Sequence, residues 1–470
     1  MAKTIINKLA EFTCDLKFED LPDEVVLESK RLVLDSIGCT LGGATHEKGK
    51  IGFQFARSLG GHPEATVIGY GDRLSAMSAS FANGEMMNAL DFDAVLPPGH
   101  VTPYVLPVAL ATAEGHCASG KDLIMVTALA HEISYRIGKA MDYLRDVKDD
   151  KVSPPSIFGY SSTIFGATAS IGKLKEYDPE LMSNALGIAG SIAPVNSHWT
   201  WLKHSPSTTI KYLHAGWLNM GALVAAGMAE LGHRGDIRIM DDEWGWRRFI
   251  GTTRWEPEII TKELGEKWLF PPFQSYKAYP HCRILAAPLD ALIHLVEEND
   301  IKPEEINSIK ALVEGFCLEP VWQNREIEHP IDAQFSVAHC LSLAAHRIPP
   351  GPAWQDISTV MNPSIRAMMD KVTFDVHPDY VESIINNPAS RPSRIEINAR
   401  GKVFTEDRLY PKGSPSPETE TYTTMDELSA KFRLNAERIL PSNKVEPAIT
   451  AMLGLEEMED ICELMWLVSL

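Results

Sequence analysis

The sequence predicts a mainly α-helical protein, with one large all-helical domain and a smaller α+β domain that forms a lid. The 470 residues are too many for one ordinary hydrophobic core and fit two domains. Apolar residues recur at helical spacing through roughly the first 270 residues. β-branched segments with a period of two follow Trp268-Leu-Phe-Pro-Pro272. We therefore expect a helical domain at 1–272, the lid at 273–410 and a return to the helical domain at 411–470.

The helices expected in the first part of the chain follow one another closely. One starts at Leu21-Pro-Asp-Glu and keeps helical spacing up to Gly42-Gly43, a typical stop signal. Further helices are expected at 75–90, 103–118, 121–141, 156–174, 178–194 and 210–231. The last of these is rich in Ala and Gly on nearly every face, which is typical of a central, buried helix.

The expected lid mixes helix and strand. A helix at 284–297 precedes strands at 309–314, 371–376 and 393–397, and Gly401 predicts a hairpin to a strand at 403–407. Three helices then return, at 426–437, 445–453 and 456–467. Small ligands usually bind in the cleft between two such domains.

Composition limits the class of protein. With 44% hydrophobic and 23% charged residues, the chain has the composition of a soluble globular protein. The formal net charge of −19, without any offsetting basic run, argues against nucleic acid as a partner. It does not exclude an anionic substrate, because a few buried Lys or His residues set the local field. No apolar run is long enough for a membrane span and no signal peptide is recognised, so we expect a cytoplasmic protein without a membrane partner.

The sequence indicates chemistry without a metal or an organic cofactor. The seven cysteines are scattered and include no Cys-x-x-Cys pair, so neither a disulfide scaffold nor a zinc site is expected. Phosphate-loop, G-x-G-x-x-G, H-E-x-x-H, G-x-S-x-G and EF-hand patterns do not occur. Without these motifs, the sequence indicates acid/base chemistry by Asp, His and Lys side chains.

Asp91, Asp93 and His100 are the first candidates. The two acids end an apolar segment, and a Pro-Pro-Gly turn separates them from the imidazole. Acids among Leu90, Phe92 and their apolar neighbours are expected to be partly buried and to need partners. His100 is suited to be that partner or a general acid/base. Ordinary polarity at a helix end is the alternative interpretation.

Lys211 is expected in the first turn of the buried helix at 210–231. Desolvation and the positive end of the helix dipole would lower its basicity, and backbone N–H groups there attract carboxylates. His214 lies three residues further on, on the same expected face. The alternative is a lysine that extends to solvent from the helix end.

Lys277 and His339 are the remaining candidates. Lys277 stands in Phe273-Gln-Ser-Tyr-Lys-Ala-Tyr-Pro-His-Cys-Arg283, with Tyr279 beside it, just past the expected domain junction. An exposed linker is the alternative there. His339 follows Asp332-Ala-Gln-Phe-Ser336 inside an apolar helix that continues to Ala345. Taken alone, His339 is interpreted as a structural histidine of the helix interior.

These segments, in this order, resemble the MmgE/PrpD family, whose activities include 2-methylcitrate dehydratase, cis-aconitate decarboxylase and iminodisuccinate epimerase. The resemblance rests on Asn88-Ala-Leu-Asp-Phe-Asp93, Gly99-His100, Lys211-Tyr-Leu-His-Ala-Gly216, Lys277-Ala-Tyr-Pro-His-Cys-Arg283 and Asp332-Ala-Gln-Phe-Ser336. It implies a helical domain with an α+β lid, a homodimer, and a cofactor-free site between the domains for a small di- or tricarboxylate. It also implies that the catalytic residues are Asp91, His100, Lys211 and Lys277.

Three positions depart from the family pattern. Ser153 stands where many members have His, His339 where many have Tyr, and Val95 where Thr is common. We expect Asp93, Ser153, His214, Tyr279 and His339 to bind the substrate.

Three hypotheses about function follow. The first is a lyase, either a dehydratase or a decarboxylase. The second is an epimerase or isomerase, in which His339 pairs with His100 or Lys277 to move protons on opposite faces of one carbon. The third is a non-catalytic carboxylate-binding protein.

Overall fold

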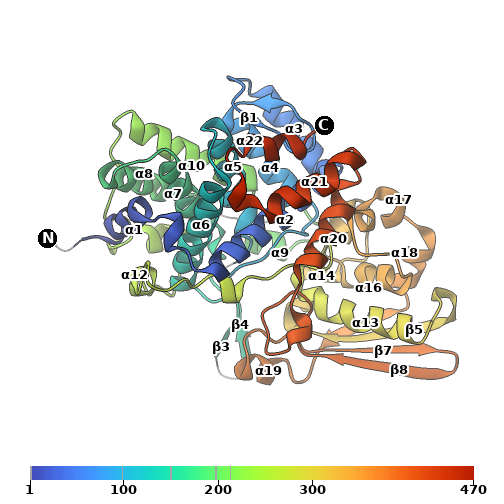
Figure 1. The fold of residues 1–470 in the computed structure, drawn as a ribbon. Coiled ribbons are helices and arrows are strands. Elements are labelled where there is room, and N and C mark those ends of the chain that lie inside the picture. The colour runs from blue at the N-terminus through green and yellow to red at the C-terminus, as the bar shows by residue number, and fades with distance from the viewer. Residues whose placement is uncertain (1–2, 98, 149–150, 196–197, 212) are drawn as a thin grey trace.

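The chain folds into a large helical part and a smaller part built on one sheet (Figure 1). The computed structural model describes residues 3–97, 99–148, 151–195, 198–211 and 213–470. The mainly α-helical class expected from the sequence is confirmed. No helix of the described residues is long and apolar enough to cross a membrane.

Helices dominate the N-terminal part. The longer ones are α1 (Ile5–Asp15), α2 (Asp23–Ala44), α3 (Glu47–Ser58), α4 (Ala76–Met87), α5 (Thr102–Gly115), α6 (Gly120–Ala140), α7 (Thr163–Leu174), α8 (Pro179–Ile192) and α10 (Ala215–Glu230). Shorter ones are α9 (His198–Leu202), α11 (Trp246–Ile250), α12 (Glu258–Thr261) and the 3-10 turns Phe18–Asp20, Gly159–Ser162 and Pro271–Phe273. Two small antiparallel pairs complete it: β1 (Ala65–Thr66) with β2 (Arg73–Leu74), and β3 (Asp146–Lys148) with β4 (Lys151–Ser153).

Helix α10 lies at the centre of this part and packs against α4, α5, α7 and α8. Close approach depends on small residues, as the contact between α2 and α4 shows. A Cβ on Gly43 would lie 1.9 Å from the backbone oxygen of Met86, so the sequence permits that contact only with glycine. The expected stop at Gly42-Gly43 is thus correct to within two residues, since α2 ends at Ala44.

Two expected helices begin later than predicted. Residues 156–162 are not α-helical, and α7 starts only at Thr163. The helix expected from Ile210 starts at Ala215 instead, as α10. Lys211 has a φ of +60°, and an L-residue in this left-handed region cannot continue a right-handed helix.

The sheet of the lid has the strand order β6-β5-β7-β8. Its strands are β5 (Ile306–Val313), β6 (Val372–Val376), β7 (Ser393–Ala399) and β8 (Lys402–Arg408), and only the β5–β6 pair is parallel. The expected hairpin joins β7 to β8 through Arg400 and Gly401, whose φ angles are +55° and +70°. Positive φ at both central residues is what a tight two-residue hairpin turn requires.

Helices cover this sheet and connect its strands, with α13 packed against β7, β8 and α16. They are α13 (Ala286–Glu298), α14 (Pro320–Gln323), α15 (Pro330–Ala333), α16 (Val337–Ala345), α17 (Ile357–Val360), α18 (Pro363–Met369) and α19 (Tyr380–Asn386), with 3-10 turns at Arg283–Leu285, Pro303–Glu305, Gly315–Leu318 and Pro352–Gln355.

The C-terminal helices return to the first part of the chain. They are α20 (Met425–Ala436), α21 (Ser442–Leu453) and α22 (Cys462–Leu467), with 3-10 turns at Thr419–Thr421 and Leu455–Glu457. In Figure 1 they lie, in red, beside the blue N-terminal helices, and α20 and α21 both pack against α2. This packing supports the proposed division at 1–272, 273–410 and 411–470, which stays a proposal.

Candidate active site

Five consecutive backbone carbonyl groups, from Asn88 to Phe92, each accept a hydrogen bond from a side chain. The donors, in chain order of the acceptors, are Lys211 Nζ at 2.7 Å, Gln334 Nε2 at 3.0 Å, Gln355 Nε2 at 2.7 Å, Lys277 Nζ at 2.7 Å and Lys431 Nζ at 2.6 Å. The segment lies just after α4, is buried and has no helix or strand to satisfy its carbonyl groups, so side chains must do so. Side chains from the helical domain, from the lid and from α20 therefore all hold this one loop in place.

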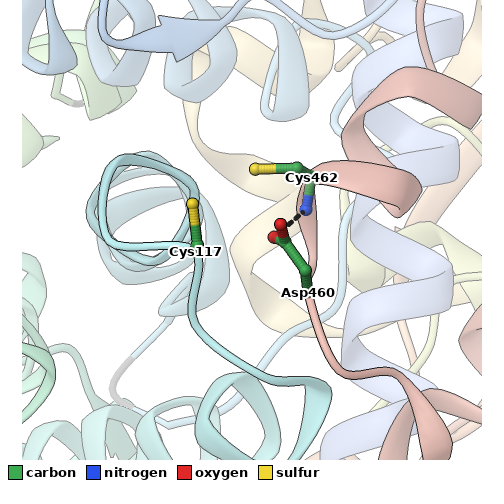
Figure 2. Close-up of side chains that lie close together, drawn as sticks. All are labelled: Cys117, Asp460 and Cys462. Atoms are coloured by element: carbon green, nitrogen blue, oxygen red, sulfur yellow. Dashed lines mark hydrogen bonds between the residues drawn. The ribbon is translucent and has the colours of Figure 1, made fainter.

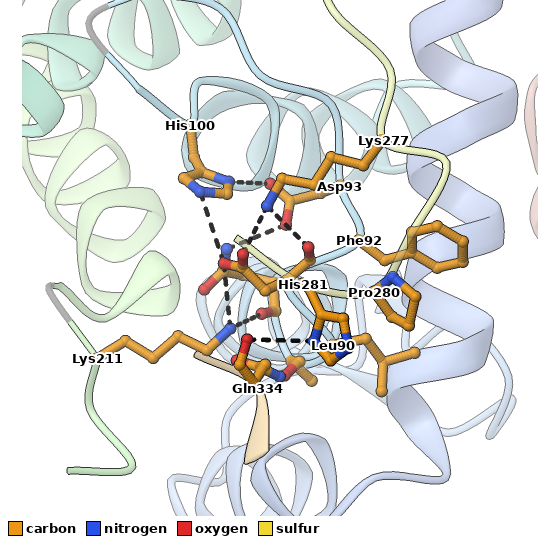
Figure 3. A network of polar contacts seen from close by, with 12 residues as sticks. Leu90, Phe92, Asp93, His100, Lys211, Lys277, Pro280, His281 and Gln334 are labelled. Carbon is orange, nitrogen blue, oxygen red and sulfur yellow. Dashed lines mark hydrogen bonds and ion pairs between the residues drawn. The ribbon is translucent and has the colours of Figure 1, made fainter. Parts of the chain in front are cut away.

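Asp91 is the centre of this loop. Its carboxylate is 2.6 Å from Lys277 Nζ, 3.5 Å from Lys211 Nζ and 3.6 Å from His100 Nε2. Figure 3 shows the two lysines approaching from opposite sides. Burial would raise the pKa of Asp91, but Lys277, Lys211 and His100 together hold it well below its usual range. Asp91 is therefore an ionised carboxylate, and its φ of +52° marks a strained backbone of the kind that clusters at functional sites.

His100 is oriented by Asp93. His100 Nδ1 lies 2.5 Å from Asp93 Oδ2, and Asn88 Nδ2 donates to Asp93 Oδ1 at 3.1 Å. Burial would raise the pKa of Asp93, but His100 lowers it below its ordinary value. An ionised carboxylate only accepts hydrogen bonds, so Nδ1 of His100 carries a proton. Nε2, the nitrogen on the side of Asp91, is then the atom that can exchange a proton with a substrate.

Lys211 lies beneath this pair and is completely buried. Besides donating to Asn88, its ammonium group lies 5.8 Å from the ring centre of Phe335. Burial lowers the pKa of Lys211 to about 7, although Asp91 raises it and Lys48 lowers it further. The helix dipole expected from the sequence is not the cause, because α10 begins only at Ala215. An amine of this kind can gain and lose a proton near neutral pH.

Asp91, His100 and Lys277 line one cavity of about 120 Å³. Its walls are mostly apolar and include Phe158, Tyr160, Trp201, Phe316, Trp322 and Phe335, together with Val95 from the loop itself. Helical-domain and lid residues contribute to the same cavity, as expected for a site between domains. A cavity of this size holds one small molecule.

Tyr160 and His198 belong to this cavity but were not predicted. The ring of His198 stacks on Phe158 with 3.5 Å between centroids and lies 5.4 Å from that of Tyr160. Burial lowers the pKa of His198 well below its ordinary value, so this imidazole is neutral. Gly99 makes room for the stack, because a Cβ there would lie 2.3 Å from the Tyr160 ring. None of these residues stands in a motif, so only the fold reveals them.

Besides Asp93, which contacts His100, four residues expected to bind the substrate do not line this cavity, so substrate binding stays a prediction for all five. Ser153 sits in β4, paired with Asp146 across the β3–β4 hairpin. The hydroxyl of Tyr279 donates to Asp290 at 2.6 Å. His339 is completely buried within α16 with Nε2 3.2 Å from the oxygen of Val360, and burial lowers its pKa to about 4.

The fourth, His214, faces a different hollow between α3 and α10. Its Nδ1 is 3.1 Å from Glu85 Oε2, and Lys48 Nζ lies 3.5 Å from the same carboxylate oxygen. Lys48 in turn lies 3.4 Å from Asn88 Oδ1. His214 thus ends a polar network that starts behind Asp93, on the side away from the cavity. The expected shared helix face with Lys211 is wrong because Lys211 precedes the helix.

The cavity's donor set suits an anion better than a metal ion, because Asp91 and Asp93 are already paired with lysine and histidine. Within the described residues, one group has the spacing for metal ligands: Cys117, Asp460 and Cys462, whose ligand atoms lie within 4.8 Å of one another (Figure 2). These residues do not line the cavity. Asp460 accepts the backbone N–H of Cys462 at 2.8 Å, and burial with this carboxylate raises the pKa of Cys462 to about 12. The thiol is therefore protonated.

Comparison with known proteins agrees with this architecture. Residues 7–258 match the family model for the MmgE/PrpD N-terminal domain, and residues 279–457 match that for the MmgE/PrpD C-terminal domain. The chain belongs to the MmgE/PrpD family. Asp91, His100 and Lys211 lie in the first matched region, and Lys277 lies between the two.

Several relatives of this MmgE/PrpD protein are cis-aconitate decarboxylases. The human enzyme is 26% identical over 98% of this chain and 93% of its own length. The enzyme of Mus musculus is 27% identical over 98% of this chain and 92% of its own, and that of Aspergillus terreus 24% over 99% and 96%.

Proposed function

We propose that this MmgE/PrpD protein is a cofactor-free lyase that acts on a small di- or tricarboxylate through proton transfer at the carbon α to a carboxylate. The observation that carries the proposal is the Asp91 cluster, in which two lysines and a histidine surround one ionised acid at the wall of a mostly apolar cavity. The similarity to cis-aconitate decarboxylases supports it.

His100 is the proposed proton-transfer group. Asp93 fixes Nδ1–H, which leaves Nε2 to take or give the substrate proton. Lys277, which lines the cavity, stabilises the negative charge that builds on the substrate carboxylate when the carbanion forms, and the buried Lys211 adds its charge from behind Asp91. Asp91 holds both ammonium groups in place. The four expected catalytic residues thus act as one unit, and Asp93 orients His100.

Decarboxylation is the reaction we favour over dehydration. When the bond from carbon to the departing carboxylate breaks, its electron pair moves onto the adjacent unsaturated system and CO₂ leaves. His100 then gives a proton to the carbon. An apolar wall favours this step because the carboxylate charge spreads out as CO₂ departs. Phe158, Trp201, Trp322 and Phe335 supply such a wall.

Epimerisation is the second candidate, and it requires two proton-transfer groups on opposite faces of one carbon. His339, expected for that role, is buried in α16 away from the cavity. His100 and Lys277 both line the cavity and are the pair that remains for this reaction.

Product analysis by NMR with cis-aconitate and a panel of hydroxylated and amino dicarboxylates tests the proposal. The proposal expects release of CO₂, or of water from a hydroxylated substrate. Deuterium entering recovered substrate in D₂O without a new product would establish the epimerase instead. Binding without any turnover or exchange would leave a carboxylate-binding protein.

We also propose a cytoplasmic homodimer. All seven cysteines are free thiols, which suits a reducing compartment. One face of α10 is apolar yet exposed, through Trp217, Val224, Met228 and the following Leu231. Ile51 and Phe55 of α3 are exposed beside it and share a hollow with Trp217. An exposed apolar patch of this kind marks a protein–protein interface, and a second copy is the simplest occupant.

A further inference from the structure

Three arginines surround one buried carboxylate next to the cavity. Arg391 is buried, whereas Arg145 and Arg283 are partly exposed. Arg145 Nη2 donates to Glu314 at 2.6 and 2.8 Å, and Arg391 Nε lies 3.0 Å from the same group. Arg283 completes the cluster, since Arg145 and Glu314 both act on its pKa. Four distant segments supply these residues: the loop after α6, the turn before α13, the end of β5 and the residues before β7. Three positive charges therefore face one negative charge.

Arg283 carries the charge that is not compensated. Within the described part of the chain it has no carboxylate at ion-pair distance, and its Nη1 donates to the neutral hydroxyl of Ser275 at 2.9 Å. Burial lowers the pKa of Arg283 to about 10, Arg145 lowers it further and Glu314 raises it. A guanidinium at the wall of a mostly apolar cavity, without an anion beside it, is stabilised by a ligand that supplies one. The planar guanidinium group is shaped to hold a carboxylate through two parallel hydrogen bonds.

Arg145 and Arg283 both line the cavity that Asp91, His100 and Lys277 line. At the His100 end, two acids, Asp91 and Asp93, are balanced by two lysines, so that end has little excess charge. The arginine end has a clear positive excess. Aromatic walls, among them Trp201, Trp322 and Phe316, complete the lining. A ligand that suits this cavity has an anionic group at the arginine end and an apolar or unsaturated segment against the walls.

We propose that Arg283 and Arg145 bind a second carboxylate of the substrate, distal to the carbon that exchanges a proton with His100. This inference rests on the proposed function, because it concerns the same cavity. Glu314 is a positioning residue, since it holds Arg145 by an ion pair, and Arg391 holds Glu314 in turn. The arginines make the site specific for molecules with at least two carboxylates. A monocarboxylate leaves Arg283 without a carboxylate partner and therefore binds less tightly.

Arg283→Met tests the proposal, with cis-aconitate compared to its monomethyl ester at the distal carboxylate. For the wild-type enzyme we expect kcat/KM to be about 100-fold higher for the acid than for the ester. In Arg283→Met this preference disappears, because the acid loses its partner while the ester never had one. Arg283→Lys keeps the charge without the two parallel donors and recovers part of the preference. A preference that Arg283→Met leaves unchanged would overturn the proposal.

A matched control is Arg394→Met, because Arg394 is an exposed arginine of β7 that pairs with Asp407. It should keep the wild-type preference. Far-ultraviolet circular dichroism of each variant establishes that the fold is retained. If Arg283→Met does not fold, Arg283→Lys replaces it in the same comparison, with a reduced preference expected, and a preference equal to that of the wild type would overturn the proposal.

Calorimetric binding of succinate and butyrate separates this inference from the proposed function. Succinate has two carboxylates and butyrate has one, so the wild-type protein should bind succinate more tightly, and Arg283→Met should bind the two alike. This result would support the arginine subsite even if no lyase activity were found. Equal binding of both molecules by the wild-type protein would overturn the subsite whatever the reaction.

Discussion

Lys277 donates to Asp91 twice, to the side-chain Oδ2 at 2.6 Å and to the backbone oxygen at 2.7 Å. One ammonium group therefore fixes both the carboxylate and the left-handed backbone that presents it. Since Lys277 comes from the domain junction and Asp91 from the loop after α4, this contact also joins the two parts of the molecule.

Removing this lysine should cost both activity and stability. Lys277→Met leaves Asp91 buried with one fewer cation, and we expect the free energy of unfolding to fall by about 3–5 kcal/mol. Asp91→Asn combined with Lys277→Met removes both charges, so stability should largely recover while activity stays lost. Urea unfolding and kcat measured for both variants check this. A double variant no more stable than Lys277→Met would contradict the pairing.

Asp93→Asn should impair catalysis without unfolding the protein. The amide can still fill the space, but it no longer requires Nδ1–H of His100, so the imidazole loses its fixed tautomer. We expect kcat to fall by about 10²–10⁴-fold, as for other histidines that lose an orienting carboxylate. Steady-state kinetics and a thermal melt are the measurements. An unchanged kcat would show that Asp93 does not orient His100.

The pH dependence of activity should include a group with a pKa of about 7 that is active when protonated. Lys211 is an ammonium group below this pH and a neutral amine above it, so charge stabilisation is lost as the pH rises. In Lys211→Arg the limb should disappear, because arginine stays charged throughout. Measuring kcat/KM from about pH 5.5 to about pH 9 tests this, because the range extends to both sides of the pKa of Lys211. Persistence of the limb in Lys211→Arg would assign it to another group.

Stability should decrease in mild acid because of buried neutral histidines. Burial lowers the pKa of His131 to about 4, so the folded state stays unprotonated while the unfolded chain takes up a proton at about 6.5. Between these values the unfolded state binds more protons, and the free energy of unfolding falls as the pH falls. From pH 6.5 to 5 this amounts to about 2 kcal/mol for one such group.

His131→Gln should reduce that loss, whereas the exposed His62→Gln should leave it as in the wild type. Urea unfolding at pH 7.5 and at pH 5.0 measures this loss in the free energy of unfolding. Equal losses in His131→Gln and the wild type would show that His131 does not contribute.

The homodimer should depend on the exposed face of α10. Trp217→Asp places a charge in the apolar patch and should give a single chain of 52.0 kDa by light scattering, where the wild type has twice this mass. Trp244→Asp, at a tryptophan outside α10 that is even more exposed than Trp217, should stay dimeric. A wild-type protein with the mass of one chain would contradict the proposed homodimer.

The sequence identified the loop of Asp91 and His100 because acids in an apolar segment must find partners. It also identified Lys211 and Lys277, and the structure brings all four residues together. For these four residues, the pattern of the neighbouring sequence was enough to make them candidates. The reason given for Lys211 was partly wrong: burial lowers its pKa, but the helix begins five residues later than expected.

Other parts of the site depend on contacts between distant segments, which no local pattern reveals. The arginine cluster joins residues 145, 283, 314 and 391, and the carbonyl groups of the loop are bound by Gln334 and Gln355 from the lid. His214 was misplaced because its helical relation to Lys211 does not exist. Tyr279 was misplaced because Asp290 of α13 binds its hydroxyl.

The most direct test of the account follows solvent hydrogen through one reaction. Incubated with cis-aconitate in D₂O, the wild-type protein should release CO₂ and give a product with one deuterium on carbon, detected by NMR. His100→Asn should fold normally and lose this reaction by several orders of magnitude, about 10³-fold or more. A product without deuterium, or turnover by His100→Asn at the wild-type rate, would contradict proton transfer by His100 at the carbon α to a carboxylate.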